Sequence, residues 1–278
     1  MDVIQAIVLG LVQGLTEFLP VSSSGHLRVV PALLGWQDPG SGFSAAIQIG
    51  TLLAVLIYFR RELIAMTGAF FKGLTGAEHR KSRDWKLAIG VIVGTLPIIV
   101  AGLSLEGSID TWLRDLRITA AALAVFGIIM WAADRWGPQT RGEEEAGMKD
   151  LLIMGLWQCL ALIPGVSRSG STITGGRLSG LTREAAARIS FLLSVPSVML
   201  SGGYKLLKER EVLLESGLAA TLIATAVAFV SGYAAIAWLI ALLKKRSLTG
   251  FMVYRVVLAA AIFIMVGMGI LDPGAGAP

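Results

Sequence analysis

Two short polar segments interrupt the apolar sequence of this chain, and they match each other without a gap. The first runs from Gln13 to His26 and the second from Pro164 to Thr172. At an offset of 145 positions the identical pairs are Gly10 and Gly155, Leu11 and Leu156, Gln13 and Gln158, Leu15 and Leu160, Val21 and Val166, Ser22 and Ser167, Ser24 and Ser169, and Gly25 and Gly170. Self-similarity at a fixed offset indicates a repeated structural unit, so we expect two copies of one fold.

Composition places both copies in a membrane. Of the 278 residues, 55% are hydrophobic and 15% are charged, and the mean hydropathy is +0.72. Soluble domains carry about 25% charged residues, so we predict an all-α integral membrane protein. The net charge of +5 comes from basic residues clustered between apolar runs, which indicates membrane topology and excludes nucleic acid as a partner. The single cysteine, Cys159, cannot form an internal disulfide.

The uncharged run that begins at Val3 has only 14 residues, whereas a spanning helix needs about 20. Glu17, Pro20 and a serine cluster follow it. This pattern predicts a re-entrant hairpin over residues 3–37, in which two short helices enter and leave by the same face and a polar tip joins them. Such a tip is tolerated only where protein or water surrounds it. The alternative is one spanning helix broken at Pro20.

The remaining apolar runs complete two repeats. We predict a first repeat over 1–133, with the hairpin at 3–37 and spans at 39–59, 87–105 and 118–133, then a cytoplasmic linker at 134–150, and a second repeat over 151–278, with a hairpin at 151–181 and spans at 189–204, 216–243 and 256–271. Pro196 aligns with Gly50, which indicates matched helix breaks in two of these spans. The acidic run at 143–145 fits an exposed loop better than a metal site.

Each repeat therefore crosses the membrane three times, giving six spans. Because three is odd, consecutive repeats must be inverted relative to each other, and their hairpins enter from opposite faces with tips that can meet near the midplane. The densest basic loop, residues 60–86, is assigned to the cytoplasm, which places both termini outside.

The residue types at the two tips are suited to binding phosphate. Arg168 offers a planar, bidentate donor, and an arginine at membrane depth is a functional candidate by default, although it could also cap a helix or bind a lipid headgroup. Glycine amides and hydroxyls would add donors. The candidate substrate-binding residues are Ser22, Ser24, Gly25, Ser167, Ser169, Gly170 and Thr172.

The first tip also carries groups that could perform chemistry. Glu17 lies four residues after Gln13 on one helix face, so the two could hold a divalent cation through a carboxylate and an amide oxygen. Glu17 could instead act as a general base. His26 could shuttle protons or attack phosphorus, and Ser23 is a candidate nucleophile if Glu17 or His26 takes its proton.

These two motifs resemble the bacterial undecaprenyl pyrophosphate phosphatase family of the bacitracin-resistance type, and the similarity covers essentially the whole chain. The resemblance implies hydrolysis of undecaprenyl pyrophosphate to undecaprenyl phosphate and inorganic phosphate, which recycles the lipid carrier of peptidoglycan synthesis. It implies a plasma-membrane protein with its site on the periplasmic or outer side, a divalent cation, Mg²⁺ or Ca²⁺, and often a homodimer.

By motif position, the resemblance assigns catalytic roles to Glu17, Ser23, His26 and Arg168, with Ser167 and Thr172 as supporting hydroxyls. Some family members have glutamate where this chain has Gln13, and this departure argues against a mechanism that needs two carboxylates on the metal. The sequence leaves open whether Ser23, His26 or water attacks phosphorus.

The sequence argues against one other enzyme class and leaves one non-enzymatic function open. A second class of lipid phosphatases needs a histidine after a serine-arginine pair, and no histidine follows Arg168. Inverted repeats with re-entrant hairpins are also typical of transporters, so a transporter or flippase of a lipid phosphate is the alternative function. A binder would need only Arg168 and the donors around it, whereas a hydrolase also needs the acid, base or nucleophile of the first tip.

Overall fold

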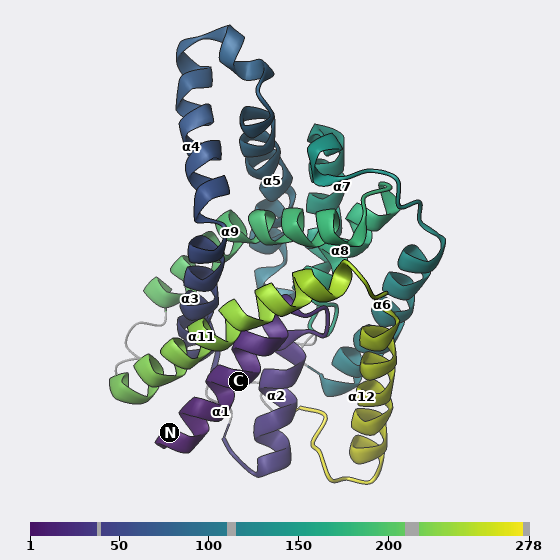
Figure 1. The fold of residues 1–278 in the computed structure, drawn as a ribbon. Helices are drawn as coiled ribbons and strands as arrows, with labels where there is room; N and C mark the ends of the chain where they lie inside the picture. The colour runs from purple at the N-terminus through teal and green to yellow at the C-terminus, as the bar shows by residue number, and fades with distance from the viewer. Residues whose placement is uncertain (38–39, 110–114, 209–216, 275–278) are drawn as a thin grey trace.

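The computed structural model describes residues 1–37, 40–109, 115–208 and 217–274, and nearly all of them are helical (Figure 1). The helices are α1 (Val3–Phe18), α2 (Ser23–Leu34), α3 (Gly40–Tyr58), α4 (Arg60–Thr75), η1 (Ala77–Lys81), α5 (Arg83–Ile109), α6 (Leu116–Trp136), η3 (Glu143–Glu145), α7 (Met148–Cys159), η4 (Leu160–Leu162), α8 (Arg168–Leu178), α9 (Arg183–Lys208), α11 (Leu218–Leu243) and α12 (Thr249–Gly267).

Five of the described helices, α5, α6, α9, α11 and α12, are long and apolar enough to cross a membrane. A sixth candidate span is the pair α3 and α4, which meet at a bend of 78°. The sequence predicted only the α3 part and treated α4 as part of a basic loop. The short helices α1, α2, α7 and α8 occupy the segments predicted as hairpins.

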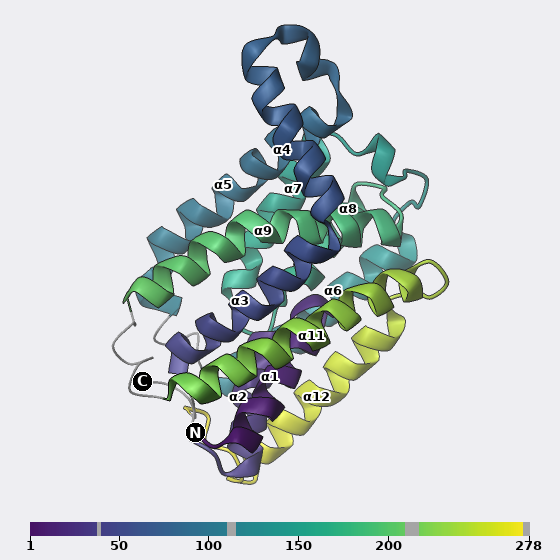
Figure 2. The ribbon, with the colours of Figure 1, turned by 60° about the vertical axis from the view of Figure 1, so that its left-hand side comes forward.

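Four long helices form a row, and the first helix of each hairpin closes one end of it. Figure 2 shows α11, α3, α9 and α5 as neighbouring slanted helices, and consecutive members are in contact. Helix α1 packs against α11 of the other half, and α7 packs against α5 of the other half. Helices α6 and α12, the last of each half, pack together. The half that contains α1 to α6 and the half that contains α7 to α12 therefore make equivalent contacts with each other.

Matched glycines make these contacts close. A Cβ atom at Gly10 of α1 would lie 2.4 Å from the carbonyl oxygen of Ala224, and one at Gly155 of α7 would lie 2.0 Å from that of Gly94. Only a residue without a side chain lets the helix backbones approach this closely. Gly10 and Gly155 are one of the pairs that the repeat conserves between its two copies, so this packing is encoded in the repeat.

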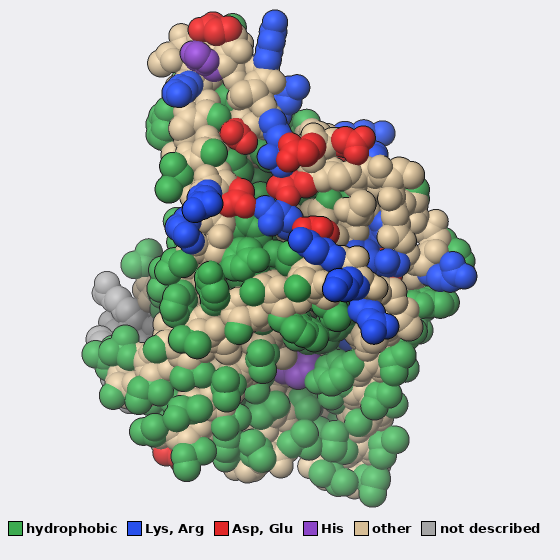
Figure 3. Space-filling model, viewed as in Figure 1, with side chains coloured by type: hydrophobic (Ala, Val, Ile, Leu, Met, Phe, Trp, Pro, Cys, Tyr) green, Lys and Arg blue, Asp and Glu red, His purple; other side chains and the backbone are tan. Residues whose placement is uncertain are grey.

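On one face of the molecule, most charged side chains collect toward one end. In Figure 3 the blue and red side chains lie in the upper part of the view, and the lower part is almost entirely hydrophobic. The N-terminus lies in the lower part of Figure 1. Several of the charges are paired across elements: Arg188 of α9 bonds Glu62 of α4 at 2.7 Å and also contacts Glu143 of η3, which Arg83 of α5 bonds at 2.9 Å.

Some sequence predictions about boundaries were wrong. The last span was started after Arg255, but α12 begins at Thr249 and buries Arg255 completely. The linker was started at Asp134, but α6 runs to Trp136 and Asp134 is buried, where it bonds Arg177 at 3.1 Å and Arg183 at 2.7 Å. In both places a charged residue was taken as a boundary, although partners within the protein let the helix continue.

The matched helix breaks expected at Gly50 and Pro196 do not occur, because α3 and α9 are continuous through these residues. Gly50 instead provides a close contact, since a Cβ atom there would lie 2.2 Å from the carbonyl oxygen of Thr225. The predictions that include residues 39, 110–114, 216 and 275–278 fall in part outside the described residues.

Candidate active site at the two tips

The two polar tips meet inside the protein, and their backbones turn in the same way. Ser22 precedes α2 with φ of 75°, and Ser167 precedes α8 with φ of 74°. Among the described non-glycine residues these are the two with positive φ, a conformation that costs about 1 kcal/mol or more and is concentrated at functional sites. The turn aims the N-terminal end of each helix at the junction. The Ser169 hydroxyl joins the tips by donating to the Leu19 carbonyl at 3.1 Å.

Glu17, at the end of α1, gathers three of the predicted site residues. Its Oε2 accepts hydrogen bonds from Ser23 Oγ at 2.7 Å and from Gln13 Nε2 at 3.0 Å, and its Oε1 accepts one from Arg168 Nη2 at 3.0 Å. The Glu17 side chain is 6% exposed and that of Arg168 is 13% exposed. The ion pair thus links the first tip to the second, and it places a hydroxyl directly on a buried carboxylate.

Arg168 has a hydrogen-bond donor that its contact with Glu17 does not use. Its Nη1 is buried and has no hydrogen-bond partner within the described chain. A buried guanidinium nitrogen without a partner is costly unless a ligand completes it. A narrow crevice reaches Arg168 and Glu17, and α3 and α9 supply its other wall. The remaining lining residues are Phe18, Thr51, Leu52, Val55, Ser194 and Val198.

His26 lies apart from the Glu17 cluster, which consists of Glu17, Gln13, Ser23 and Arg168. Its Nδ1 is 2.7 Å from the carbonyl oxygen of Ser22, and its Nε2 is 2.5 Å from the hydroxyl of Tyr254 on α12. Both ring nitrogens are therefore occupied by groups other than Ser23 or Glu17. The structure does not join His26 to Ser23 as an acid/base pair.

The other predicted binding residues have local roles in the described structure. The Ser167 hydroxyl caps α8 by accepting from the Gly170 amide at 3.1 Å, and the Ser22 and Ser24 hydroxyls are 3.2 Å apart. Ser24 is exposed. Thr172 faces away from the junction toward Ser190, with the two hydroxyl oxygens 2.5 Å apart.

The two predicted glycines are buried against other helices. A Cβ atom at Gly25 would lie 3.4 Å from Thr119, and one at Gly170 would lie 3.0 Å from the guanidinium of Arg255.

Arg255 is a site residue that the sequence analysis missed. It is fully buried in α12, and its hydrogen bonds in the described chain all go to backbone carbonyls. Those of Pro20 in the first tip (3.1 Å) and Gly165 and Val166 in the second (3.0 Å each) hold the two tips together. The available signal was a lone arginine within an apolar run, which is expensive at membrane depth and so needs a partner.

A divalent cation fits the donor set only if substrate oxygens complete its shell. The described residues contain no group of three or more His, Cys, Asp or Glu side chains placed to hold a metal. Glu17 offers a carboxylate, and Gln13 Oε1 is a buried amide oxygen without a hydrogen-bond partner in the described chain. Mg²⁺ is commonly held by one or two carboxylates together with substrate phosphates. The predicted pair Gln13 and Glu17 is therefore chemically compatible with a cation shared with a phosphate.

The family model described as "Bacitracin resistance protein BacA" matches residues 6–261 of this chain. The chain belongs to the BacA family. The match includes both tips, Glu17, Arg168 and the α12 residues Tyr254 and Arg255, so the whole junction lies within the part of the sequence that defines the family.

Relatives within the BacA family share about half of their residues with this chain. A protein of Thermobifida fusca named undecaprenyl-diphosphatase is 50% identical over 277 residues, covering 100% of this chain and 94% of its own length. The undecaprenyl-diphosphatase of Myxococcus xanthus is 46% identical, covering 99% and 93%. That of Chloroherpeton thalassium is 48% identical, covering 98% and 99%. The family and the apolar helices together establish a multi-pass membrane protein.

Proposed function

We propose that this protein hydrolyses undecaprenyl diphosphate to undecaprenyl phosphate and inorganic phosphate at the junction of the two tips. The observation that carries the proposal is the Glu17 cluster: a buried carboxylate that bonds both a serine hydroxyl and an arginine with an unpartnered nitrogen. The substrate is inferred from the relatives, which are named undecaprenyl-diphosphatase. A transporter would need the arginine but would have no use for a hydroxyl held on a carboxylate.

We assign Ser23 as the nucleophile because its hydroxyl already donates to Glu17 at 2.7 Å, whereas both nitrogens of His26 are occupied elsewhere. Glu17 takes the Ser23 proton as Oγ bonds to the terminal phosphorus, and the bond from phosphorus to the bridging oxygen breaks. The proton passes to the departing undecaprenyl phosphate. Glu17 then takes a proton from the water that attacks phosphoserine, and this proton returns to Ser23 as phosphate leaves.

The junction also supplies positive potential where negative charge develops. Arg168 Nη1 is available for a phosphoryl oxygen, and the N-terminal ends of α2 and α8, which begin at Ser23 and Arg168, favour anions. A divalent cation held by Glu17 and Gln13 would neutralise further charge on the diphosphate. Its identity as Mg²⁺ or Ca²⁺ stays part of the proposal.

We further propose that the two halves are inverted-topology repeats in the bacterial plasma membrane. The exchange of equivalent contacts, α1 on α11 and α7 on α5, supports a two-fold relation between the halves. On the face seen in Figure 3 most charged side chains lie at the end opposite the N-terminus, which supports a cytoplasmic position for that end and an outer position for the termini. The homodimer implied by the family resemblance stays a prediction.

The test is phosphate release from undecaprenyl diphosphate by detergent-purified protein, with Glu17→Gln and Arg168→Ala as variants. Each should lower kcat/KM by roughly 10²- to 10⁴-fold, the usual range for a lost catalytic group. Glu62→Gln, which removes a carboxylate from an arginine pair at the charged end, is the matched control and should keep full activity. A chelator should stop release until a divalent cation is restored. Full turnover by Glu17→Gln would refute the assigned site.

A further inference from the structure

His26 has two polar contacts in the described chain, and together they define its tautomer. The Ser22 carbonyl, 2.7 Å from Nδ1, can only accept a hydrogen bond, so Nδ1 carries the proton. In the neutral ring Nε2 is then a lone-pair acceptor, and the Tyr254 hydroxyl at 2.5 Å must be the donor. The imidazole is therefore held at both nitrogens, with its basic nitrogen facing α12.

The surrounding structure fixes both partners of the ring. The Ser22 carbonyl is turned toward His26 by the positive φ of Ser22, and it also accepts from the His26 amide at 3.3 Å. Tyr254 is anchored by its neighbour Arg255, which bonds the backbone of both tips. The rings of His26 and Tyr254 are nearly parallel, at an interplanar angle of 6° with centroids 5.6 Å apart.

The two side chains differ in how far they are exposed at the surface of the chain. His26 is 7% exposed, whereas Tyr254 is 46% exposed. Among the described residues, the Tyr254 hydroxyl is the polar group that contacts the basic nitrogen of His26. Any proton that reaches or leaves this nitrogen has to pass the hydroxyl or displace it.

We propose that Tyr254 is a positioning residue for the phosphatase site, which keeps His26 neutral, protonated at Nδ1, and oriented with Nε2 toward the tyrosine hydroxyl. The expected effect of Tyr254 on catalysis rests on the proposed function. Its structural part, the hydrogen bond from Tyr254 to Nε2, stands independently and can be measured without substrate. Neither the sequence motifs nor the Glu17 cluster point to this residue.

The test combines nitrogen NMR of isotopically labelled histidine with kinetics. Because the chain has two histidines, a His79→Gln background leaves the His26 ring as the single imidazole signal. We expect a protonated Nδ1 and a hydrogen-bonded, unprotonated Nε2. Tyr254→Phe keeps the stacked ring and removes only the hydroxyl, so the Nε2 resonance should move toward that of a free imidazole nitrogen while Nδ1 stays protonated.

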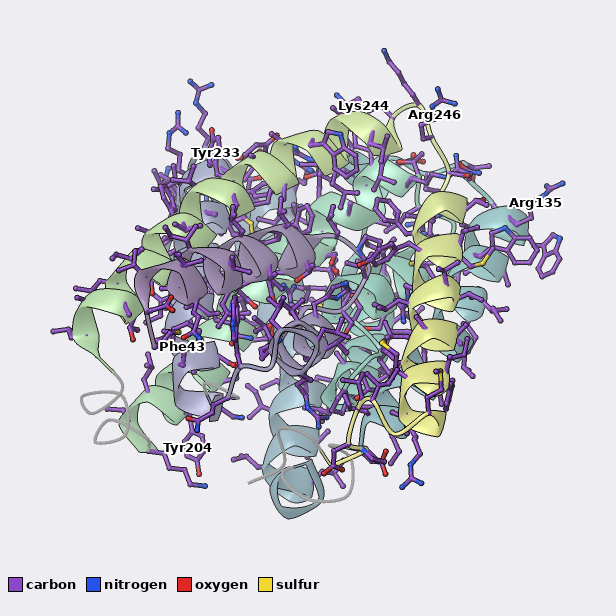
Figure 4. All side chains as sticks on the ribbon, turned by 90° about the horizontal axis from the view of Figure 1, so that it is seen from below. Phe43, Arg135, Tyr204, Tyr233, Lys244 and Arg246 are labelled. Atoms are coloured by element: carbon purple, nitrogen blue, oxygen red, sulfur yellow. The ribbon has the colours of Figure 1, made fainter. Side chains whose placement is uncertain are left out.

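Tyr254→Phe should also lower kcat by roughly tenfold or more, with KM changed less than about twofold. His26 bonds the Ser22 carbonyl of the turn that places Ser23 on Glu17, so a ring freed at Nε2 no longer fixes the nucleophile, whereas substrate binding is left alone. Tyr233→Phe is the matched control: this tyrosine is 38% exposed on the outer side of α11 (Figure 4) and should change neither signal nor rate. An unmoved Nε2 resonance, a protonated Nε2 in the unsubstituted ring, or an unchanged kcat would each overturn the proposal. If Tyr254→Phe gave the expected NMR change but the unsubstituted protein had no phosphatase activity, the proposed function would be refuted and the hydrogen bond from Tyr254 to His26 would stand.

Discussion

Two arginines at the tip junction use their hydrogen-bond donors in opposite ways. Arg255 directs its guanidinium to backbone carbonyls of both tips and of α6, whereas Arg168 uses Nη2 on Glu17 and has Nη1 buried without a partner in the described chain. A guanidinium with satisfied donors is structural, and one with an open donor is suited to an anion. Arg255 therefore holds the two tips in place, whereas Arg168 is available to bind substrate.

Arg255→Lys tests this division at the residue scale. A lysine keeps the charge, but its single ammonium cannot reach the carbonyls of Pro20, Gly165 and Leu123 together. Each carbonyl left unpaired costs about 1–3 kcal/mol, so we expect a clear fall in melting temperature together with lost activity. Thermal unfolding in detergent measures this. Arg246→Lys, in the exposed loop after α11 (Figure 4), should melt like the parent protein. An unchanged melting temperature for Arg255→Lys would contradict the bridging role.

At the scale of elements, the hairpins are held by helices of the other half. The contact of α7 with α5 depends on Gly155, and that of α1 with α11 depends on Gly10. Because each hairpin presents one tip, these two contacts also set how the tips meet. The spacing between Glu17 and Arg168 therefore depends on contacts with α11 and α5, helices that lie far along the chain from the hairpins they hold.

Gly155→Ala tests this packing. The added methyl group would overlap the Gly94 carbonyl, and relieving the overlap requires α7 to move away from α5, at a cost of about 1–3 kcal/mol or more. We expect a lower melting temperature and reduced phosphate release. Gly68→Ala on α4 is the matched control, since a methyl group there meets nothing within 4 Å and should be neutral or slightly stabilising. If Gly155→Ala melted no lower than Gly68→Ala, the close approach of α7 and α5 would not be a stabilising feature.

At the scale of the whole molecule, the distribution of charge predicts the orientation in the membrane. The loop between α11 and α12 carries Lys244 and Arg246, which extend away from the protein (Figure 4), whereas Gly274 follows the C-terminal end of α12. A membrane that follows the positive-inside rule would place the first in the cytoplasm and the second outside.

Single-cysteine labelling in intact cells checks this orientation. In a Cys159→Ala background, Gly274→Cys should react with a membrane-impermeant thiol reagent, and Ser247→Cys should react only after the membrane is permeabilised. Both positions are exposed in the structure, so access to the reagent depends on the side of the membrane. The opposite pattern would reverse the proposed topology, and reaction of both in intact cells would rule out separate sides.

The sequence by itself determined the membrane class, the repeat and the residues of the Glu17 cluster, because these depend on local patterns. Apolar runs specify helices in lipid, and Glu17, Ser23 and Arg168 stand in polar motifs that apolar sequence makes conspicuous. It could not determine which helices pack together, or which groups bond the charged side chains that lie inside helices. Arg255, Asp134 and Tyr254 each bond a partner that lies 132, 43 and 228 residues away, respectively. Only the tertiary structure brings such groups together, because the cost of burying them is offset by contacts that do not exist until the helices pack.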